Sequence, residues 1–198
     1  MNCTSCRTHD CYLNGKNCLG KDEKEVIDLY TEEEVRIMQS ASRTESENYL
    51  KMTRLEESLY FVRDMGYTKV GIAFCIGLAN EAELCAAYFR NNGIKVESLC
   101  CKNCGVDKDL LELSKIKKGS KEVMCNPKMQ AENMNRAKTD INFIVGLCVG
   151  HDVIFTKNSN APVSSLITKD RVLANNPAGV VYSRYWKRKL GILEEDQV

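Results

Sequence analysis

Two kinds of apolar pattern alternate along the chain. Residues 69–75 (KVGIAFC) and 141–148 (INFIVGLC) are almost continuously apolar, which is typical of strands buried on both faces. Residues 94–100 and 163–168 also have strand character. Helices are expected between these strands and after them, at 78–91, 107–117, 127–138 and from Pro177 onward.

Strands that alternate with helices predict an α/β fold. We expect a four-stranded parallel sheet in a three-layer, Rossmann-like or flavodoxin-like arrangement with right-handed crossovers. Residues 22–65 are predicted to form a long charged leading helix that ends at Gly66. One apolar face of its second half is formed by Tyr49, Met52, Leu55, Leu59 and Val62. The predicted domains are a cysteine-rich segment, residues 1–20, and an α/β domain, residues 21–198.

Charge and hydropathy exclude several classes of partner. The 198 residues include 28 Lys and Arg against 27 Asp and Glu, so no overall field attracts nucleic acid or an anionic membrane. The basic run 187–189 is interpreted as the solvated end of the last helix. The chain has no apolar run of about twenty residues and no signal-peptide core. We therefore expect a cytoplasmic protein whose partner is an unidentified small-molecule ligand or electron donor.

Eleven cysteines change this picture, because structural disulfides are rare in a reducing cytoplasm. Cys75, Cys101 and Cys148 lie at the carboxyl ends of predicted strands, which share one edge of a parallel sheet. Cys104 follows in the stretch LCCKNCG, and Cys125 precedes Asn126-Pro127, a helix start where the dipole favours thiolate. Clustered thiolates become favourable when they bind a cation, so a metal site is predicted there.

Not every cysteine is expected to be a ligand. Free cysteines also serve as small buried apolar residues, and Cys85 is assigned that role on the inward face of helix 78–91. Cys100 and Cys101 point to opposite faces of a strand, so Cys101 is paired with Cys104 instead and the role of Cys100 stays open. The predicted inner metal ligands are Cys75, Cys101, Cys104, Cys125 and Cys148.

The first twenty residues contain a second cysteine set, Cys3, Cys6, Cys11 and Cys18, with little that could enter a core. Either zinc or an iron–sulfur cluster is compatible with four thiols at this spacing, and His9 could replace one of them. The alternative is a flexible, reactive tail.

Long strings of the chain resemble an uncharacterised cysteine-rich family of bacteria and archaea labelled as predicted metal-binding proteins. The strings are YLKMTRLEES, KVGIAFCIGLANEAE, SLCCKNCGVDK, MCNPKMQAE, GLCVGHDVIF and SNAPVSSLITKDRVLANNPAG. The resemblance covers almost the whole chain. It implies metal binding in a cytosolic, often anaerobic setting, and it implies no particular reaction.

The same strings contain polar residues that a ligand site would use. His151 and Asp152 follow Cys148 and could relay protons or supply a ligand, or Asp152 could merely cap a helix. Lys169 and Arg171 follow the fourth strand, and Arg171 could bind a carboxylate or phosphate unless the segment is an ordinary solvated loop. Arg54 and Glu56 could pack toward the site, although a charged helical face usually meets solvent.

These observations predict a small redox or sulfur-handling metalloprotein. An iron–sulfur cluster, expected as 4Fe-4S, is preferred at the sheet edge because five or six thiolates suit it, whereas zinc needs four ligands. His151 and Asp152 are the catalytic candidates, and Lys169 and Arg171 are the ligand-binding candidates. The alternatives are a zinc-binding or metal-sensing module without catalysis, and a metal with a folding role only.

Overall fold

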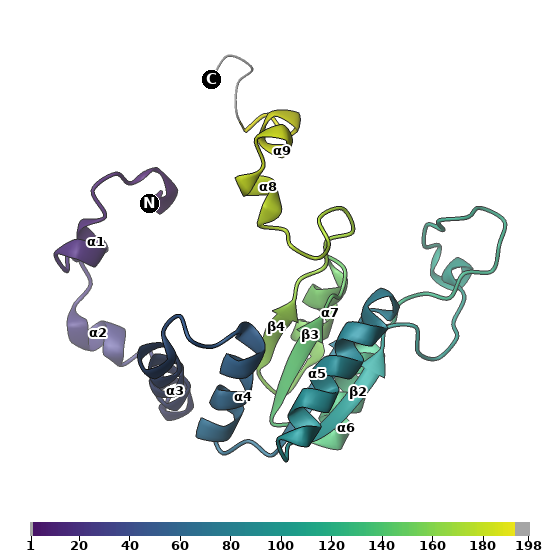
Figure 1. Cartoon of the computed structure of the whole chain (residues 1–198), viewed down its shortest axis with the longest axis horizontal. Helices are drawn as coiled ribbons and strands as arrows, with labels where there is room; N and C mark the ends of the chain where they lie inside the picture. The colour runs from purple at the N-terminus through teal and green to yellow at the C-terminus, as the bar shows by residue number, and fades with distance from the viewer. Residues whose placement is uncertain (1, 193–198) are drawn as a thin grey trace. The chain divides into compact units, whose positions relative to one another are not determined.

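The computed structural model describes residues 2–192, which divide into two compact units, Met1–Glu47 and Asn48–Val198. The first unit has a single 3-10 turn, η1 (Cys3–Ser5), and the helices α1 (Asp10–Leu13), α2 (Glu23–Ile27) and α3 (Glu32–Asn48). The second unit contains the sheet. Figure 1 labels the elements of both.

The long leading helix predicted for residues 22–65 is wrong, because the segment forms α2, α3 and α4 (Arg54–Asp64). Each helix starts at its own side-chain cap. Asp22 accepts from the backbone N–H groups of Lys24 and Glu25, and a Thr–Glu capping box at Thr53 and Glu56 starts α4. Leu50, with φ of 57°, interrupts the helical path before α4.

Four parallel strands form the sheet, as predicted. They are β1 (Lys69–Phe74), β2 (Lys95–Cys100), β3 (Ile141–Val145) and β4 (Val163–Ile167). Their order is β2-β1-β3-β4, so the order reverses between β1 and β3. In this register Phe74 lies opposite Cys100 on one side and Val145 on the other, which brings the ends of three strands level.

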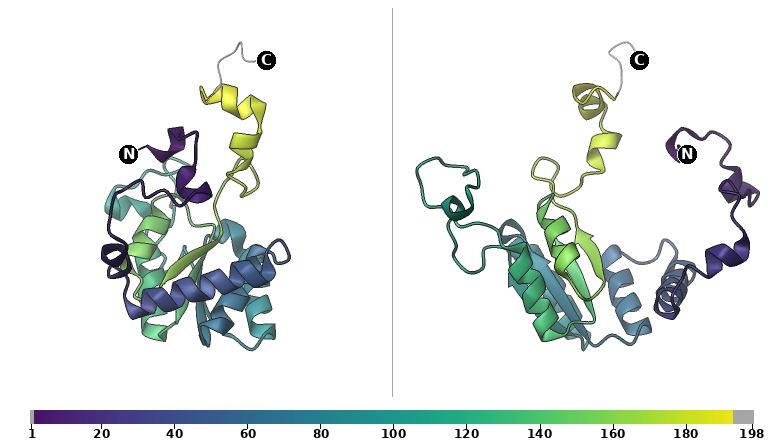
Figure 2. Two further views of the ribbon diagram at one scale, coloured as in Figure 1. Left: turned by 90° about the vertical axis from the view of Figure 1, so that its left-hand side faces the viewer. Right: turned by 180° about the vertical axis from the view of Figure 1, so that it is seen from behind.

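Helices cover both faces of the sheet, and the α/β architecture is compatible with a Rossmann-like fold. On one face α4 and α5 (Ala79–Asn91) pack Leu59, Val62 and Phe89 against the strands, and Phe89 stacks on Phe143 of β3. On the other face lie α6 (Pro127–Ala137) and α7 (His151–Asn158), seen in front of the sheet in Figure 2, right. They contribute a second core, which includes Met134 and Phe155.

Three further differences from the sequence prediction concern helices and strand ends. The polar helix expected at 107–117 is only the 3-10 turn η3 (Lys108–Leu111), and β3 ends three residues before Cys148. The expected terminal helix is two short ones, α8 (Gly179–Tyr182) and α9 (Arg184–Lys189). The turn η2 (Ile76–Leu78) joins β1 to α5. Within residues 2–192, no helix is long and apolar enough to cross a membrane.

Candidate thiol site

The carboxyl ends of β1 and β2 bring buried thiols together. Cys75 directly follows β1 and is 8% exposed, and Cys101 directly follows β2 and is 1% exposed. The Cys101 Sγ accepts a hydrogen bond from the backbone N–H of Ile76 at 3.4 Å, which ties the two strand ends together. The predicted convergence of thiols at this edge therefore holds for Cys75 and Cys101.

Cys125 joins them from the start of α6. The Asn126 side chain accepts from the Met129 N–H at 3.1 Å and Pro127 is the first helical residue, as the sequence predicted. The Asn126 N–H also donates to the Cys101 carbonyl oxygen at 2.8 Å. This backbone contact holds Cys125 beside Cys101, and each thiol shifts the pKa of the other.

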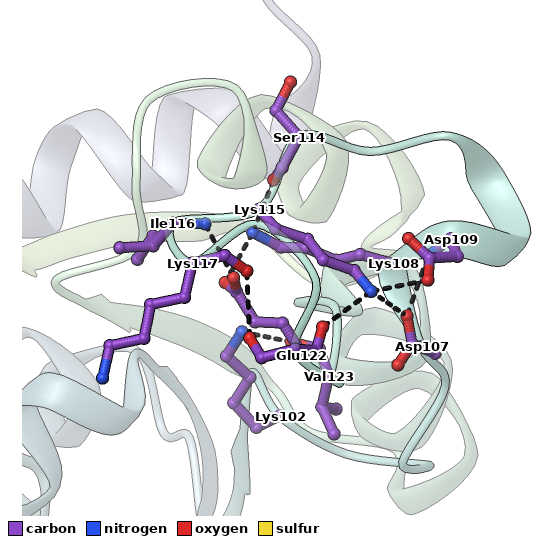
Figure 3. Close-up of polar contacts among 11 residues, drawn as sticks. Lys102, Asp107, Lys108, Asp109, Ser114, Lys115, Ile116, Lys117, Glu122 and Val123 are labelled. Carbon is purple, nitrogen blue, oxygen red and sulfur yellow. Dashed lines mark hydrogen bonds and ion pairs between the residues drawn. The ribbon is translucent and has the colours of Figure 1, made fainter.

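The chain between these two cysteines forms a loop with a closed neck, residues 102–124. The backbone pairs Lys108 N–H to Glu122 C=O at 3.0 Å and Met124 N–H to Val106 C=O at 2.8 Å across the neck. Ion pairs brace the loop beyond it, with Lys108 Nζ 2.6 Å from Glu122 Oε1 and Lys115 between Asp107 and Asp109 (Figure 3). A braced loop fixes where Cys125 lies relative to Cys101.

The electrostatics of the pair are asymmetric. The hydrogen bond from the Cys101 thiol, together with the positive charges of Lys102 and His151, lowers the pKa of Cys125 to about 5 despite burial. The same hydrogen bond, burial and the nearby Cys75 raise the pKa of Cys101 above its ordinary value. Cys101 therefore keeps its proton and donates it to a Cys125 thiolate, which is the nucleophilic form of cysteine.

The other predicted inner cysteines are arranged differently. Cys148 lies in the turn after β3, where its sulfur accepts a hydrogen bond from Arg171 Nη2 at 2.9 Å. The Cys100 sulfur accepts from the backbone N–H of Lys102 at 3.4 Å. Cys104 is exposed, outside the buried thiols, and both it and Gly105 have positive φ values of 68° and 63°. Cys85 lies in the core under α5, as predicted, and burial raises its pKa.

The four amino-terminal cysteines are all exposed. Cys6 is the most constrained of them, because hydrogen bonds from the backbone N–H of His9 and from Thr8 lower the pKa of its thiol. Throughout the part of the chain that the structure describes, no three or more His, Cys, Asp or Glu side chains are arranged so that they could hold a metal ion. The metal roles of both cysteine sets stay predictions.

Basic side chains from several elements surround the inner thiols. His151 is the first residue of α7 and acts on Cys125 through its charge. A methyl group added at Gly77 would lie 3.1 Å from Lys169 Nζ and 4.0 Å from Cys75 Sγ, which places Lys169 at the same edge. Lys102 donates to the Val123 carbonyl oxygen, and its positive charge lowers the pKa of Cys125. The edge of the sheet is therefore positively charged around its sulfur atoms.

The acidic candidates Asp152 and Glu56 accept hydrogen bonds from backbone N–H groups and have no recorded contact with the thiols. Asp152 is the second residue of α7, whose N-cap is Gly150, and its side chain accepts from the N–H groups of Gly150 and Val153 at 2.9 and 2.8 Å rather than acting as the N-cap itself. Arg54 binds β4, donating to Ser164 Oγ at 2.8 Å, and Glu56 completes the capping box of α4. Neither Arg54 nor Glu56 makes a recorded contact with the thiols.

Two residues of the site were not singled out from the sequence. Lys102 lies within LCCKNCG, and its position next to Cys101 was an available signal. Gln130 is fully buried in α6, where its Nε2 donates to the Phe74 and Leu99 carbonyls at 3.1 and 2.6 Å while its Oε1 has no partner. Its polarity within an otherwise buried helical face was the one signal for its role.

A cleft of about 590 Å³ lies beside α7, where apolar residues of β3 and β4 such as Ile144 and Ile167 line it together with Asp152 and Lys157. No cysteine lines this cleft. The chemistry of the thiols therefore identifies the site better than the shape of the surface does.

Comparisons with known proteins find one matching family model and a full-length relative. The model of the family described as "Protein of unknown function (DUF1847)" matches residues 16–166. A relative from Methanocaldococcus jannaschii, "Uncharacterized protein MJ0455", is 47% identical over 191 residues, which cover 96% of this chain and 98% of the relative. No solved structure matches the chain. Because the family model matches most of its length, the chain, whose described part carries the thiol edge, belongs to the DUF1847 family.

Proposed function

We propose that the chain is a redox or sulfur-handling protein whose reactive group is the Cys125 thiolate. The observation that carries this proposal is the neighbouring pair of Cys101 and Cys125, joined through the Asn126 N–H and the Cys101 carbonyl oxygen at 2.8 Å, together with the positive charges of Lys102 and His151 that lower the pKa of Cys125. Cys125 is half-buried, whereas Cys101 is almost fully buried, so Cys125 is the more accessible of the two. Low-pKa, partly exposed thiols in a positive environment are typical of reactive cysteines.

The pair supports a complete two-step reaction with an organic disulfide. The Cys125 thiolate attacks one sulfur of the disulfide, forms a mixed disulfide and releases one thiolate. Cys101 then attacks the Cys125 sulfur and passes its proton to the second thiolate as it leaves. The Cys101–Cys125 pair is oxidised by two electrons, and the disulfide is reduced to two thiols. A reducing compartment such as the cytoplasm suits a pair that starts reduced.

Residue-resolved alkylation tests the proposal. We expect limiting iodoacetamide, a neutral reagent, to modify Cys125 of the reduced full chain at pH 7 faster than Cys100 and Cys148, which are also half-buried. Mass spectrometry of the peptides measures each site separately, and buried Cys85 serves as the internal control. If Cys125 reacts no faster than Cys85, the proposal is wrong.

Binding of a soft metal is a second candidate, with an iron–sulfur cluster preferred and zinc as the alternative. Cys75, Cys101 and Cys125 supply soft donors at one edge, and hydrogen bonds that lower the pKa of Cys6 favour its thiolate, the form that ligates metals. Because no metal-holding group exists among residues 2–192 as they stand, binding requires side chains to turn.

Metal and acid-labile sulfide analysis of protein purified without oxygen tests this candidate. We expect iron with sulfide that is lost in Cys101→Ser and retained in Cys85→Ala. A colourless protein with stoichiometric zinc would favour the alternative, and a metal-free protein would exclude both. A metal on Cys125 would also protect it from alkylation until a chelator is added, which separates the two candidates in one preparation.

A further inference from the structure

The last strand of the sheet, β4, has an open edge. It pairs with β3 on one side, and no strand of residues 2–192 pairs with its other side. Asn142 of β3 is aligned with Val163 and donates its N–H to the Pro162 carbonyl oxygen at 2.8 Å. In a parallel ladder this pattern turns the N–H and C=O groups of Val163 and Ser165 away from β3. Such outward backbone groups are a template for a further strand.

Only one of these four backbone groups has a partner recorded within residues 2–192. Arg54 Nε and Nη2 each lie 3.4 Å from the Ser165 carbonyl oxygen, and Nη2 also donates to Ser164 Oγ at 2.8 Å. The Val163 N–H, the Val163 C=O and the Ser165 N–H stay open. In an antiparallel pair, a residue placed opposite Val163 exchanges two hydrogen bonds with it.

The cleft of about 590 Å³ runs along this strand on its α7 side. Its volume lies within the range of about 300–1,000 Å³ that small-ligand pockets span. Val163 and Ile167 of β4 line it together with Ile144 and Leu147, so its floor is mainly apolar. Alternate side chains of an added strand would point to this face of the sheet, where the cleft can receive them.

The two charged residues of the cleft lie toward its opposite ends. Asp152 and Lys157 both line it from α7, and their five-residue separation corresponds to about 7.5 Å along the helix axis. Because α7 leads into β4, Lys157 lies toward the start of β4 and Asp152 toward its end. Asp152 engages backbone N–H groups through Oδ1, which leaves Oδ2 open. Lys157 has no ion pair recorded within the described residues.

We propose that this cleft and the open edge of β4 bind a short apolar peptide with free ends, about three or four residues long, as a strand antiparallel to β4. The peptide backbone bonds to Val163 and Ser165, and alternate side chains fill the cleft. Its carboxylate lies at Lys157 and its ammonium group at Asp152. Three residues of an antiparallel strand span about 10 Å, which side chains reaching from the two ends of α7 can match.

The charges at the two ends distinguish this ligand from the alternatives. A peptide parallel to β4 would bring its carboxylate to Asp152, where like charges repel. An internal segment of a longer protein has no charged ends, and an apolar small molecule has no backbone to bond with Val163. The inference does not depend on the thiol chemistry proposed above, because no cysteine lines the cleft.

The test titrates the nitrogen-15-labelled full chain with the peptide Leu-Val-Leu and follows its backbone amide resonances. We expect saturable shifts centred on Val163 and Ser165. The C-terminal amide and the N-acetyl form of the peptide should each bind about threefold more weakly, the worth of a partly exposed ion pair. A form with N-methylated backbone amides should not saturate, because it cannot donate to β4.

Lys157→Gln tests the direction of the peptide. It should weaken binding of Leu-Val-Leu about threefold and leave binding of the C-terminal amide unchanged. Lys128→Gln, an exposed lysine of α6, is the matched control and should change neither. Asp152 is left intact because it also holds the turn at Gly150, so the N-acetyl peptide tests its contribution instead.

Three results would overturn the inference. One is an absence of saturable shifts at β4 with millimolar Leu-Val-Leu. The second is equal binding of the N-methylated form, which would show that the cleft traps apolar side chains without adding a strand. The third is equal weakening of the free acid and the amide by Lys157→Gln, or equally tight binding of a longer peptide blocked at both ends, because the ends would then not be recognised.

Discussion

Cys101 and Cys125 have the same side chain, but their surroundings shift the pKa values of the two thiols in opposite directions. Cys101 is 1% exposed and has no cation recorded against its sulfur, so holding its proton is favourable. Cys125 is half-buried, next to Lys102, and receives the hydrogen bond that Cys101 donates. The two environments together create one donor and one nucleophile from a pair of thiols.

The pH dependence of alkylation is therefore expected to report on Cys101. In the wild type the Cys125 rate should change little between pH 8 and pH 6 and fall only as the pH approaches the pKa of about 5. In Cys101→Ala the donor is lost and the pKa of Cys125 rises, so the rate at pH 6 should fall about tenfold or more. Cys101→Ser keeps a hydroxyl donor and is expected to fall less.

The rate of Cys125 alkylation is measured at each pH by quenching the iodoacetamide reaction at set times, for the wild type, Cys101→Ala and Cys101→Ser. Identical profiles for the wild type and Cys101→Ala would show that the hydrogen bond does not set the ionisation of Cys125. Lys102→Met tests the second cause, because the positive charge of Lys102 also lowers the pKa of Cys125.

At the scale of elements, α6 is fastened to the sheet by one polar side chain. Gln130 Nε2 bridges the carbonyls of Phe74 and Leu99, the residues that immediately precede Cys75 and Cys100. The Phe74 carbonyl oxygen also accepts from the Cys101 N–H at 2.8 Å. The Gln130 hydrogen bond therefore joins α6 to the strand ends directly beside Cys75 and Cys101. Since Cys125 leads into α6, the bridge helps to hold Cys125 against the strand ends.

Gln130→Glu should therefore destabilise the fold in a pH-dependent way. An ionised carboxylate cannot donate to two carbonyl oxygens and is buried, so we expect a loss of about 1–3 kcal/mol or more in the free energy of unfolding at neutral pH. Burial raises the pKa of the new carboxyl in the folded state, so the loss should shrink as the pH falls. Urea denaturation at several pH values measures it, with Glu132→Gln on the exposed side of α6 as the control.

The central strands β1 and β3 were predictable because each is a buried apolar run, whereas the edge strands β2 and β4 contain fewer apolar residues and were recognised by their strand character between helices. Their parallel pairing follows from the intervening helices. Helix α7 was missed for a physical reason. Only Phe155 of its residues is buried, while Val153 and Ile154 are exposed, so it has no apolar periodicity to detect. The leading helix was over-extended although the Thr53–Glu56 capping box is visible in the sequence.

The cysteines that strand ends position could be predicted from the sequence, whereas those in irregular loops could not. Cys75 and Cys101 could be placed together because parallel strands end at one edge. The predicted partner Cys104 is exposed instead, because the chain enters two left-handed residues there, and no sequence rule assigns that conformation to a cysteine. The opposite pKa shifts of Cys101 and Cys125 depend on burial and on neighbours from other parts of the chain, such as Cys75 and His151, which only the folded chain brings together.

At the scale of the whole molecule, the sheet consists of two halves that are each continuous in the chain. β1 and β2 are adjacent in sequence and in space, and so are β3 and β4. The loop 102–124 falls between these halves, and exposed Ile116 lies beyond its braced neck. Each half brings its own helices, α4 and α5 in one case and α6 and α7 in the other.

Because of this arrangement, the chain should tolerate being made as two separate fragments, one for each half of the sheet. Two polypeptides, residues 1–117 and 118–198, should reassemble when they are co-expressed, because β1 and β3 pair along their length and the cut lies in an exposed turn. Co-purification through a tag on one fragment measures the association, and a cut placed inside α6 is the control that should abolish it. Cys101 belongs to the first fragment and Cys125 to the second, so rapid alkylation of Cys125 should appear only when the halves meet. The thiol pair would then serve as a built-in signal of complementation between two separately made pieces.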